Sequence, residues 1–170
     1  MFNLMETRTV GAHDLSMLLW RERELLELLL FKLEEEQLLL TAGKNRWLGF
    51  ATREVEQVLE RLRQSGVERA IAVHGLAEEW AFADGATLRE IIEHAPDEVW
   101  RDIFAQHLTA LGELTEEVRR LRDANLMFLR SAARMARETL GAIDPDAGTY
   151  DTQGSAERGG PGARFFERDI

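Results

Sequence analysis

The sequence of 170 residues contains no cysteine, one tyrosine and only three prolines. Without cysteine the chain forms no disulfide and offers no thiolate to a metal ion, which is compatible with a reducing compartment. No proline lies between residues 97 and 141, so nothing of that kind interrupts a helix in this stretch. The chain can therefore contain one very long helix.

The chain also lacks an excess of positive charge and a long apolar run. Its formal net charge of −10 argues against nucleic acid and anionic membrane surfaces as partners, because both need a basic surface. The most apolar segment, residues 25–40, contains five charged residues and is too polar to span a bilayer. Residues 1–10 lack the basic start and apolar core of a secretion signal. We therefore expect a cytoplasmic protein with no membrane insertion.

Sequence motifs of enzymes are missing as well. We find no Gly-x-Gly-x-x-Gly, no phosphate-binding loop and no Gly-x-Ser-x-Gly. A di-iron bundle needs Glu-x-x-His motifs, and the sequence has none. The histidines (His13, His74, His94 and His107) fall on different predicted elements. We expect no catalytic residue, no metal site and no cofactor, and keep a ferritin-like metal enzyme only as an alternative.

The dominant pattern in the sequence is helical and covers residues 96–141. Positions recur at alternating spacings of four and three, which keeps one seam of a helix facing the same neighbour. The seam consists of Trp100, Phe104, His107, Leu111, Leu114, Val118, Leu121, Asn125, Phe128, Ala132, Met135 and Thr139. The opposite side is charged between Glu113 and Asp123, and is expected to be solvated. Asn125 either sets the register with a partner helix or is a satisfied polar group of the core.

Two other long helices are expected before this one. Residues 15–40 show the same spacing, with Asp14 as the N-cap and Gly43 as a left-handed stop. Residues 46–80 form the second helix, with a kink expected at the Ser65-Gly66 pair, where the spacing shifts. Whether this second helix is continuous stays open.

A short helix and a tail complete the prediction. Thr87 and Glu90 form a capping box that opens a helix over residues 88–94. Pro96 is expected in the first turn of the long helix, where a proline costs no hydrogen bond. Residues 142–170 are rich in glycine and have no apolar period, so we expect a flexible acidic tail that follows a helical domain of residues 1–141.

The predicted fold is all-α. It is an elongated antiparallel helical bundle or coiled coil of three long helices and one short helix, with a disordered C-terminal tail. Beyond Asn125 the seam stays apolar where the shorter helices run out as neighbours, and methionine and small residues there form an adaptable surface. We expect a partner to bind at Leu126, Met127, Phe128, Leu129, Met135 and Leu140.

Several segments of the sequence resemble the FlgN-like flagellar export chaperones, which chaperone hook-associated proteins. They are the leucine-rich run from Leu15 to Gly43, the Arg46-Trp-Leu segment, the segment from Glu68 to His74, and Leu121-Arg-Asp-Ala-Asn. The resemblance covers roughly residues 10–150 and implies a non-enzymatic helical chaperone of flagellar type III export. Such a chaperone holds the terminal helices of the hook–filament junction proteins, prevents premature assembly and delivers them to the export gate.

In this family the C-terminal helix region binds the client, and an aromatic residue of the tail contacts the export gate. Here these roles would fall on Leu126 to Leu140 and on the tail aromatics Tyr150, Phe165 and Phe166, although the Gly-rich end departs from the family pattern. The alternative from another class is a self-associating coiled-coil scaffold, a homo-oligomer in which the long seam pairs between copies.

Overall fold

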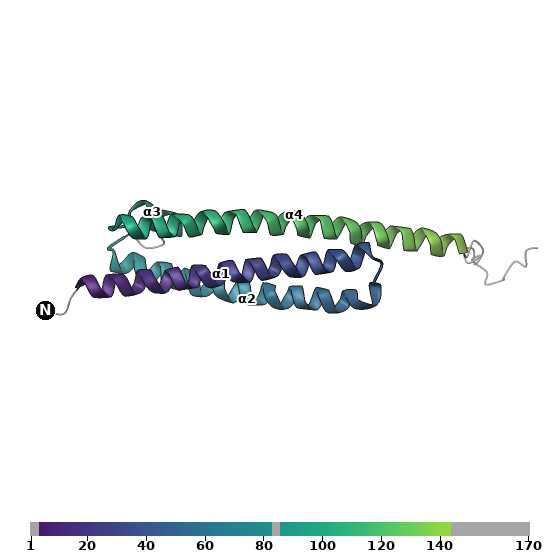
Figure 1. The fold of residues 1–170 in the computed structure, drawn as a ribbon, viewed down its shortest axis with the longest axis horizontal. Coiled ribbons are helices and arrows are strands. Elements are labelled where there is room, and N and C mark those ends of the chain that lie inside the picture. The colour runs from purple at the N-terminus through teal and green to yellow at the C-terminus, as the bar shows by residue number, and fades with distance from the viewer. Residues whose placement is uncertain (1–3, 83–85, 144–170) are drawn as a thin grey trace, which may run out of the picture. The chain divides into compact units, whose positions relative to one another are not determined.

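Four helices make up the described part of the chain (Figure 1). The computed structural model describes residues 4–82 and 86–143. In chain order the helices are α1 (Leu4–Thr41), α2 (Asn45–Glu79), α3 (Leu88–Glu93) and α4 (Glu98–Ile143). The described residues contain no strand, and the prediction of an all-α fold with three long helices and one short helix is confirmed. None of these helices is apolar enough over a sufficient length to cross a membrane.

The chain divides into two compact units, Met1–Ser131 and Ala132–Ile170. The first unit contains α1, α2, α3 and most of α4, and the second begins within α4. The predicted tail lies almost entirely outside the described residues, so the domain boundary after residue 141 stays a prediction.

Helices α1 and α2 form an antiparallel hairpin. Arg21 lies 3.7 Å from Glu68, and Lys32, further along α1, lies 2.9 Å from Glu54, which comes earlier in α2. The turn between them uses Gly43 at a φ of 65°, the left-handed conformation that the sequence predicted. The amide of Lys44 donates to the carbonyl of Leu39 at 2.9 Å, which satisfies one of the free carbonyls at the end of α1.

Within the first unit, α4 runs parallel to α1. Ser16 Oγ lies 3.3 Å from His107 Nε2, and Asn125 Nδ2 donates to the carbonyl of Leu33 at 2.8 Å. Because both contacts advance together along the two helices, the directions agree. The predicted antiparallel arrangement therefore holds for α1 with α2 and for α2 with α4, while α1 and α4 are parallel.

Local sequence explains the connection from α2 to α4. The amide of Thr87 donates to Glu90 Oε2 at 2.7 Å, and the amide of Glu90 donates to Thr87 Oγ1 at 3.3 Å, which confirms the predicted capping box. These bonds, first the one from the amide and then the one from the hydroxyl, lower the pKa of Glu90. Asp97 Oδ1 accepts from the amide of Val99 at 2.8 Å. Helix α4 therefore begins at Glu98, and the prediction that Pro96 lies in its first turn was wrong.

The prediction of where α1 begins was also wrong. The helix begins at Leu4, so Asp14 lies inside it and is not an N-cap. The weak apolar pattern of the first residues gave no sign of a helix, but no proline breaks one there either. Gly11 allows a close approach by α2, because a Cβ atom on it would lie 2.7 Å from Glu79 Oε2. Helix α2 is continuous through Ser65 and Gly66.

The core of the first unit is formed by two apolar clusters. The larger one joins all four helices, and its largest fully buried side chains are Leu15, Leu19, Leu76, Ile91 and Phe104. The smaller one, nearer the hairpin turn, consists of Leu29, Leu33, Val55 and Val58, with Val118 and Leu121 of α4 packed against it. The described core therefore extends along α4 as far as Leu121, at the level of Leu29 and Leu33 of α1.

A charged group is buried on the α1–α2 contact. The carboxylate of Glu22 is buried, and Arg69 Nε lies 3.3 Å from its Oε2 atom. Burial raises the pKa of Glu22, and the positive charge of Arg69 opposes this shift only in part. The sequence had placed Glu22 in the apolar seam of its helix, and the structure shows why a carboxylate is tolerated there.

The core assignment predicts a large effect of truncating Phe104, which has no exposed surface. We expect Phe104→Ala to lower the free energy of unfolding by about 3–5 kcal/mol, because it leaves a cavity among side chains of all four helices. Urea unfolding followed by circular dichroism measures this. Val99→Ala, at an exposed position of the same helix, is the control. Equal losses in both variants would contradict the assignment.

Candidate functional site

The burial of α4 changes along its length. Phe104, His107 and Leu111 are buried against the other helices, and Leu114, Val118 and Leu121 are half-buried. Asn125 is only 2% exposed. It is the last buried residue of the helix among those described, and every seam position after it is exposed. The predicted seam is thus core in its first part and surface in its last part.

The register between α1 and α4 accounts for this change. The contacts of Ser16 with His107, of Leu33 with Asn125 and of Glu36 with Asn125 join residues 91, 92 and 89 positions apart. Helix α1 ends at Thr41, so this register brings α1 alongside α4 only up to about residue 131. The apolar residues at the end of the first unit consequently have little left to pack against.

Each predicted binding residue has a defined environment in its own unit. In the first unit, Leu126, Met127 and Phe128 are exposed, Met127 by 71%, and Leu129 is half-buried. In the second unit, Met135 and Leu140 are exposed. Within each unit, exposed apolar side chains of this kind on a helix can be covered by another helix. Their role in binding stays a prediction.

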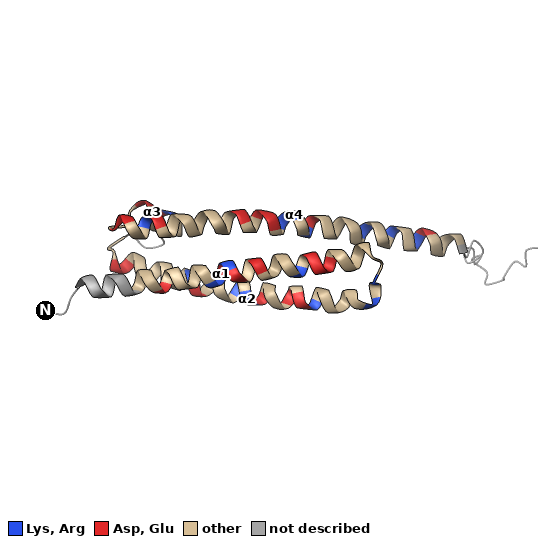
Figure 2. Ribbon diagram, in the orientation of Figure 1, with Lys and Arg blue, Asp and Glu red and all other residues tan. Residues whose placement is uncertain are grey.

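A basic stripe accompanies these apolar residues, and our sequence analysis missed it. Arg130, Arg134 and Arg137 follow the same alternation of four and three residues as the seam, and all three are exposed. Figure 2 shows Lys and Arg prevailing over Asp and Glu in this part of α4. The signal was present in the sequence, but the overall charge of −10 concealed it.

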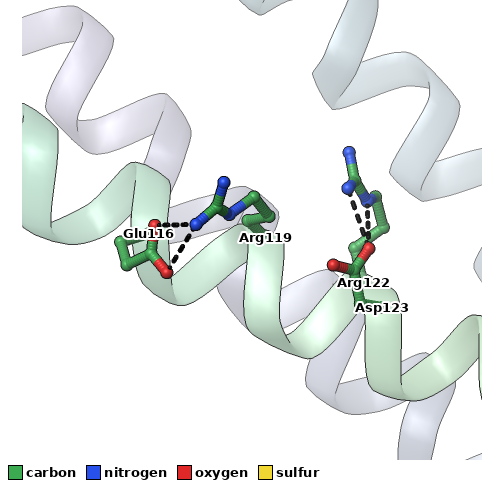
Figure 3. A network of polar contacts seen from close by, with 4 residues as sticks. All are labelled: Glu116, Arg119, Arg122 and Asp123. Atoms are coloured by element: carbon green, nitrogen blue, oxygen red, sulfur yellow. Dashed lines mark hydrogen bonds and ion pairs between the residues drawn. The ribbon is translucent and has the colours of Figure 1, made fainter.

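The charged side of the middle of α4 is solvated, as predicted. Arg119 binds Glu116 at 2.7 Å, and Arg122 binds Asp123 at 2.8 Å, with all four side chains at least half exposed (Figure 3). Exposed pairs of this kind contribute between zero and about 1 kcal/mol to stability. They keep this side of the helix in water.

A buried polar layer marks the end of the core. Asn125 Nδ2 donates to the carbonyl of Leu33 and, at 3.2 Å, to Glu36 Oε2, while Thr52 Oγ1 donates to Glu36 Oε1 at 2.8 Å. Three helices therefore meet at one carboxylate. Of the two interpretations left open by the sequence, the structure favours a core polar group of its own chain, because Nδ2 of Asn125 is bonded within the chain, although its buried Oδ1 atom has no hydrogen-bond partner.

His107 is a core residue in the structure. Its ring packs edge-on against Trp20 with 5.2 Å between ring centroids, and Ser16 is its hydrogen-bonding neighbour. Burial, and after it the positive charge of Arg23, lowers the pKa of His107. The polar contacts described for the other histidines are local, with His74 3.5 Å from Glu78 and His94 bonded to the carbonyl of Glu90, and the His94 ring also packs against Phe82 with 5.5 Å between ring centroids. No group of acidic and histidine side chains within the described ranges could hold a metal ion.

The predicted tail contacts cannot be placed. Tyr150, Phe165 and Phe166 lie outside the described residues. Their proposed contact with an export gate therefore stays a prediction from the family resemblance.

The fold and this surface define a helical protein with a packed core at one end of α4 and an exposed apolar helix face at the other. A comparison with protein families agrees with the resemblance noted from the sequence. The family described as FlgN protein matches residues 5–158. The chain therefore belongs to the FlgN family, which is a family of flagellar export chaperones. No curated protein and no solved structure matches the chain.

The environment of His107 predicts a pH dependence of stability. Because its folded-state pKa lies below the usual value of 6.5, folding favours the neutral ring, and this contribution is complete above that pH. It is lost as the pH falls through the lowered pKa, so the free energy of unfolding decreases on acidification.

We expect His107→Gln, which keeps a polar group near Ser16, to remove this part of the dependence. Urea unfolding of both proteins at about pH 7.5 and pH 5.5 measures it, since these values bracket the usual histidine pKa. An identical loss of stability in both proteins would show that His107 does not contribute.

Proposed function

We propose that this chain is a flagellar export chaperone that binds the terminal helices of hook-associated proteins through the exposed C-terminal part of α4. The observation that supports this most is the loss of cover after Asn125, where the apolar seam continues at the surface. Membership of the FlgN family supports a flagellar protein as the client, and the hook-associated class is our proposal.

The physical argument concerns the client. A helix that will later pack in a polymer carries an apolar stripe, and this stripe stays exposed to water until assembly. An apolar helix face on the chaperone can cover that stripe, with the apolar positions of each helix filling the grooves of the other. Met127 and Met135 suit a surface that accepts more than one client sequence, because methionine adapts its shape.

The arginine stripe adds a preference to this mode. Arg130, Arg134 and Arg137 would lie along one edge of the bound helix. We propose that the client helix carries acidic residues on the matching edge. Charges at the rim of an interface act mainly on the rate of association and on orientation.

The further steps of the proposal follow from the family. The chaperone acts in the cytoplasm, keeps the client from assembling before export, and delivers it to the export gate of the flagellar type III system. Tyr150, Phe165 and Phe166 are the residues we propose for the contact with the gate.

Removing the terminal helices of the client tests the binding mode. The chain is titrated with an intact hook-associated protein and with a version that lacks both terminal helices, by isothermal calorimetry. We expect binding of the intact client only. Equal affinity for both versions would refute the mode, although another client surface could then still be bound.

Two substitutions in α4 test the chaperone side. Phe128→Asp with Met135→Asp places a charge on each unit's exposed apolar face, and we expect the affinity for the client to fall by more than about tenfold. Helicity should be unchanged, because neither side chain is buried.

The matched control is Met17→Asp with Leu38→Asp, which puts the same charges on similarly exposed apolar positions of α1. A control that loses as much affinity as the α4 variant would show that the effect is not local. Unfolding of the α4 variant would show that these residues are part of the core.

A further inference from the structure

A second apolar surface lies on the outer face of α2. Val67 and Ile71 are 61% and 68% exposed, and Leu59 lies on the same side of the helix two turns before Val67. The inner side of α2 is buried through Val58, Val73, Leu76 and Ala77. A shallow groove on the outer face is lined by Arg63, Gly66, Val67, Arg69, Ala70, Ile71 and His74. None of the contacts that hold α1 and α4 in the first unit uses Val67 or Ile71.

Opposite charges flank this face at equal distances. Arg63 lies seven residues before Ala70, and Glu78 lies seven residues after Ile71, so each is about 10 Å from the point between them. Both side chains are largely exposed, and their ion pairs within the chain are with residues of the same helix, Glu60 and His74. The charges of the face are therefore complementary to those of the same face in a second copy whose α2 runs in the opposite direction.

We propose that this face binds the same face of a second copy, with the two α2 helices antiparallel about a twofold axis between Ala70 and Ile71. Arg63 of each copy then lies opposite Glu78 of the other, which gives two ion pairs for one contact. Ala70 lies opposite Ile71, and Val67 packs beside His74. Gly66 and Gly75 lie on the two flanks of the contact, about a quarter turn from its centre, and add no side chain there. A contact of this kind closes on itself and gives a dimer rather than a filament.

Charge selects this register over its neighbours. If the helices slid until Val67 faced Ile71, Glu60 would lie opposite Glu78 and two pairs of like charges would meet. A slide in which Val67 faced Ala70 would put Arg63 opposite His74 and leave Glu78 opposite the apolar Leu59. Of these three registers, only the first pairs opposite charges at both ends of the apolar contact.

The contact is weak and independent of the client. One pair of helices buries less than the roughly 1,200 Å² of a stable interface, so the dimer dissociates on dilution. It differs from the scaffold that we considered from the sequence, because the seam of α4 is occupied by α1 of the same chain as far as Asn125 and the proposed contact uses α2 instead. It uses none of the residues proposed for client binding, so its failure would leave that proposal intact.

A charge exchange tests the register. Sedimentation equilibrium of the full chain between about 1 µM and 1 mM should show a monomer–dimer equilibrium. Arg63→Glu alone and Glu78→Arg alone should each weaken dimerisation by about tenfold, because like charges then meet twice. The double variant should restore it. A monomer at every concentration, or single variants that dimerise like the natural chain, would overturn the proposal.

A single cysteine gives the second readout, since the chain has none of its own. In the proposed dimer the two Ala70 positions lie close to the axis, within the Cα separation of about 4.4–6.8 Å that a disulfide needs. Ala70→Cys should therefore form a covalent dimer on mild oxidation. Glu117→Cys, on the solvated side of α4, is the control, and equal cross-linking of both would overturn the proposal. The proposal would also be overturned if the natural chain stayed monomeric and the Arg63→Glu variant lost client binding. In that case the face would bind the client and not a second copy.

Discussion

The register between α1 and α4 is the constraint on which the rest of the first unit depends. It is fixed at one end by Ser16 and His107 and at the other by Leu33, Glu36 and Asn125. Since the two helices are parallel and α1 is the shorter, the register decides how much of α4 is covered. A different register would bury Phe128 or expose Phe104, and with them would move the boundary between core and surface.

The polar layer at Glu36 explains why that register is not free to slide. A purely apolar seam could shift by one heptad at little cost, because leucine fits almost any hole. Asn125 and Thr52 donate to the same buried carboxylate, so a shift would leave polar groups without partners, at a cost of about 1–3 kcal/mol for each group. Glu36 therefore contributes specificity at a place where leucine would contribute more stability.

Much of this arrangement could be predicted from the sequence because it follows from helical periodicity. The 4–3 spacing identified the buried positions from Phe104 to Asn125 and even the acidic seam positions Glu22 and Glu36. Periodicity identifies faces but not directions, so it could not show that α1 and α4 are parallel. It also gave no signal for the helix before Asp14, where apolar spacing is weak. The exposed end of α4 was expected because its neighbours are shorter, while its function as a binding site rests on the family and on the experiments proposed above.

The spacing of about 90 residues between paired positions of α1 and α4 also has a consequence for how the chain folds. The α1–α2 hairpin closes through a turn of three residues, whereas the contacts between α1 and α4 join residues about 90 positions apart, and closing a longer stretch of chain carries a larger entropic cost. Since α4 leaves the ribosome after α1 and α2, the hairpin can form before α4 docks on it. The element that carries the apolar end is thus made and docked after the hairpin, and local opening of the folded protein should begin there.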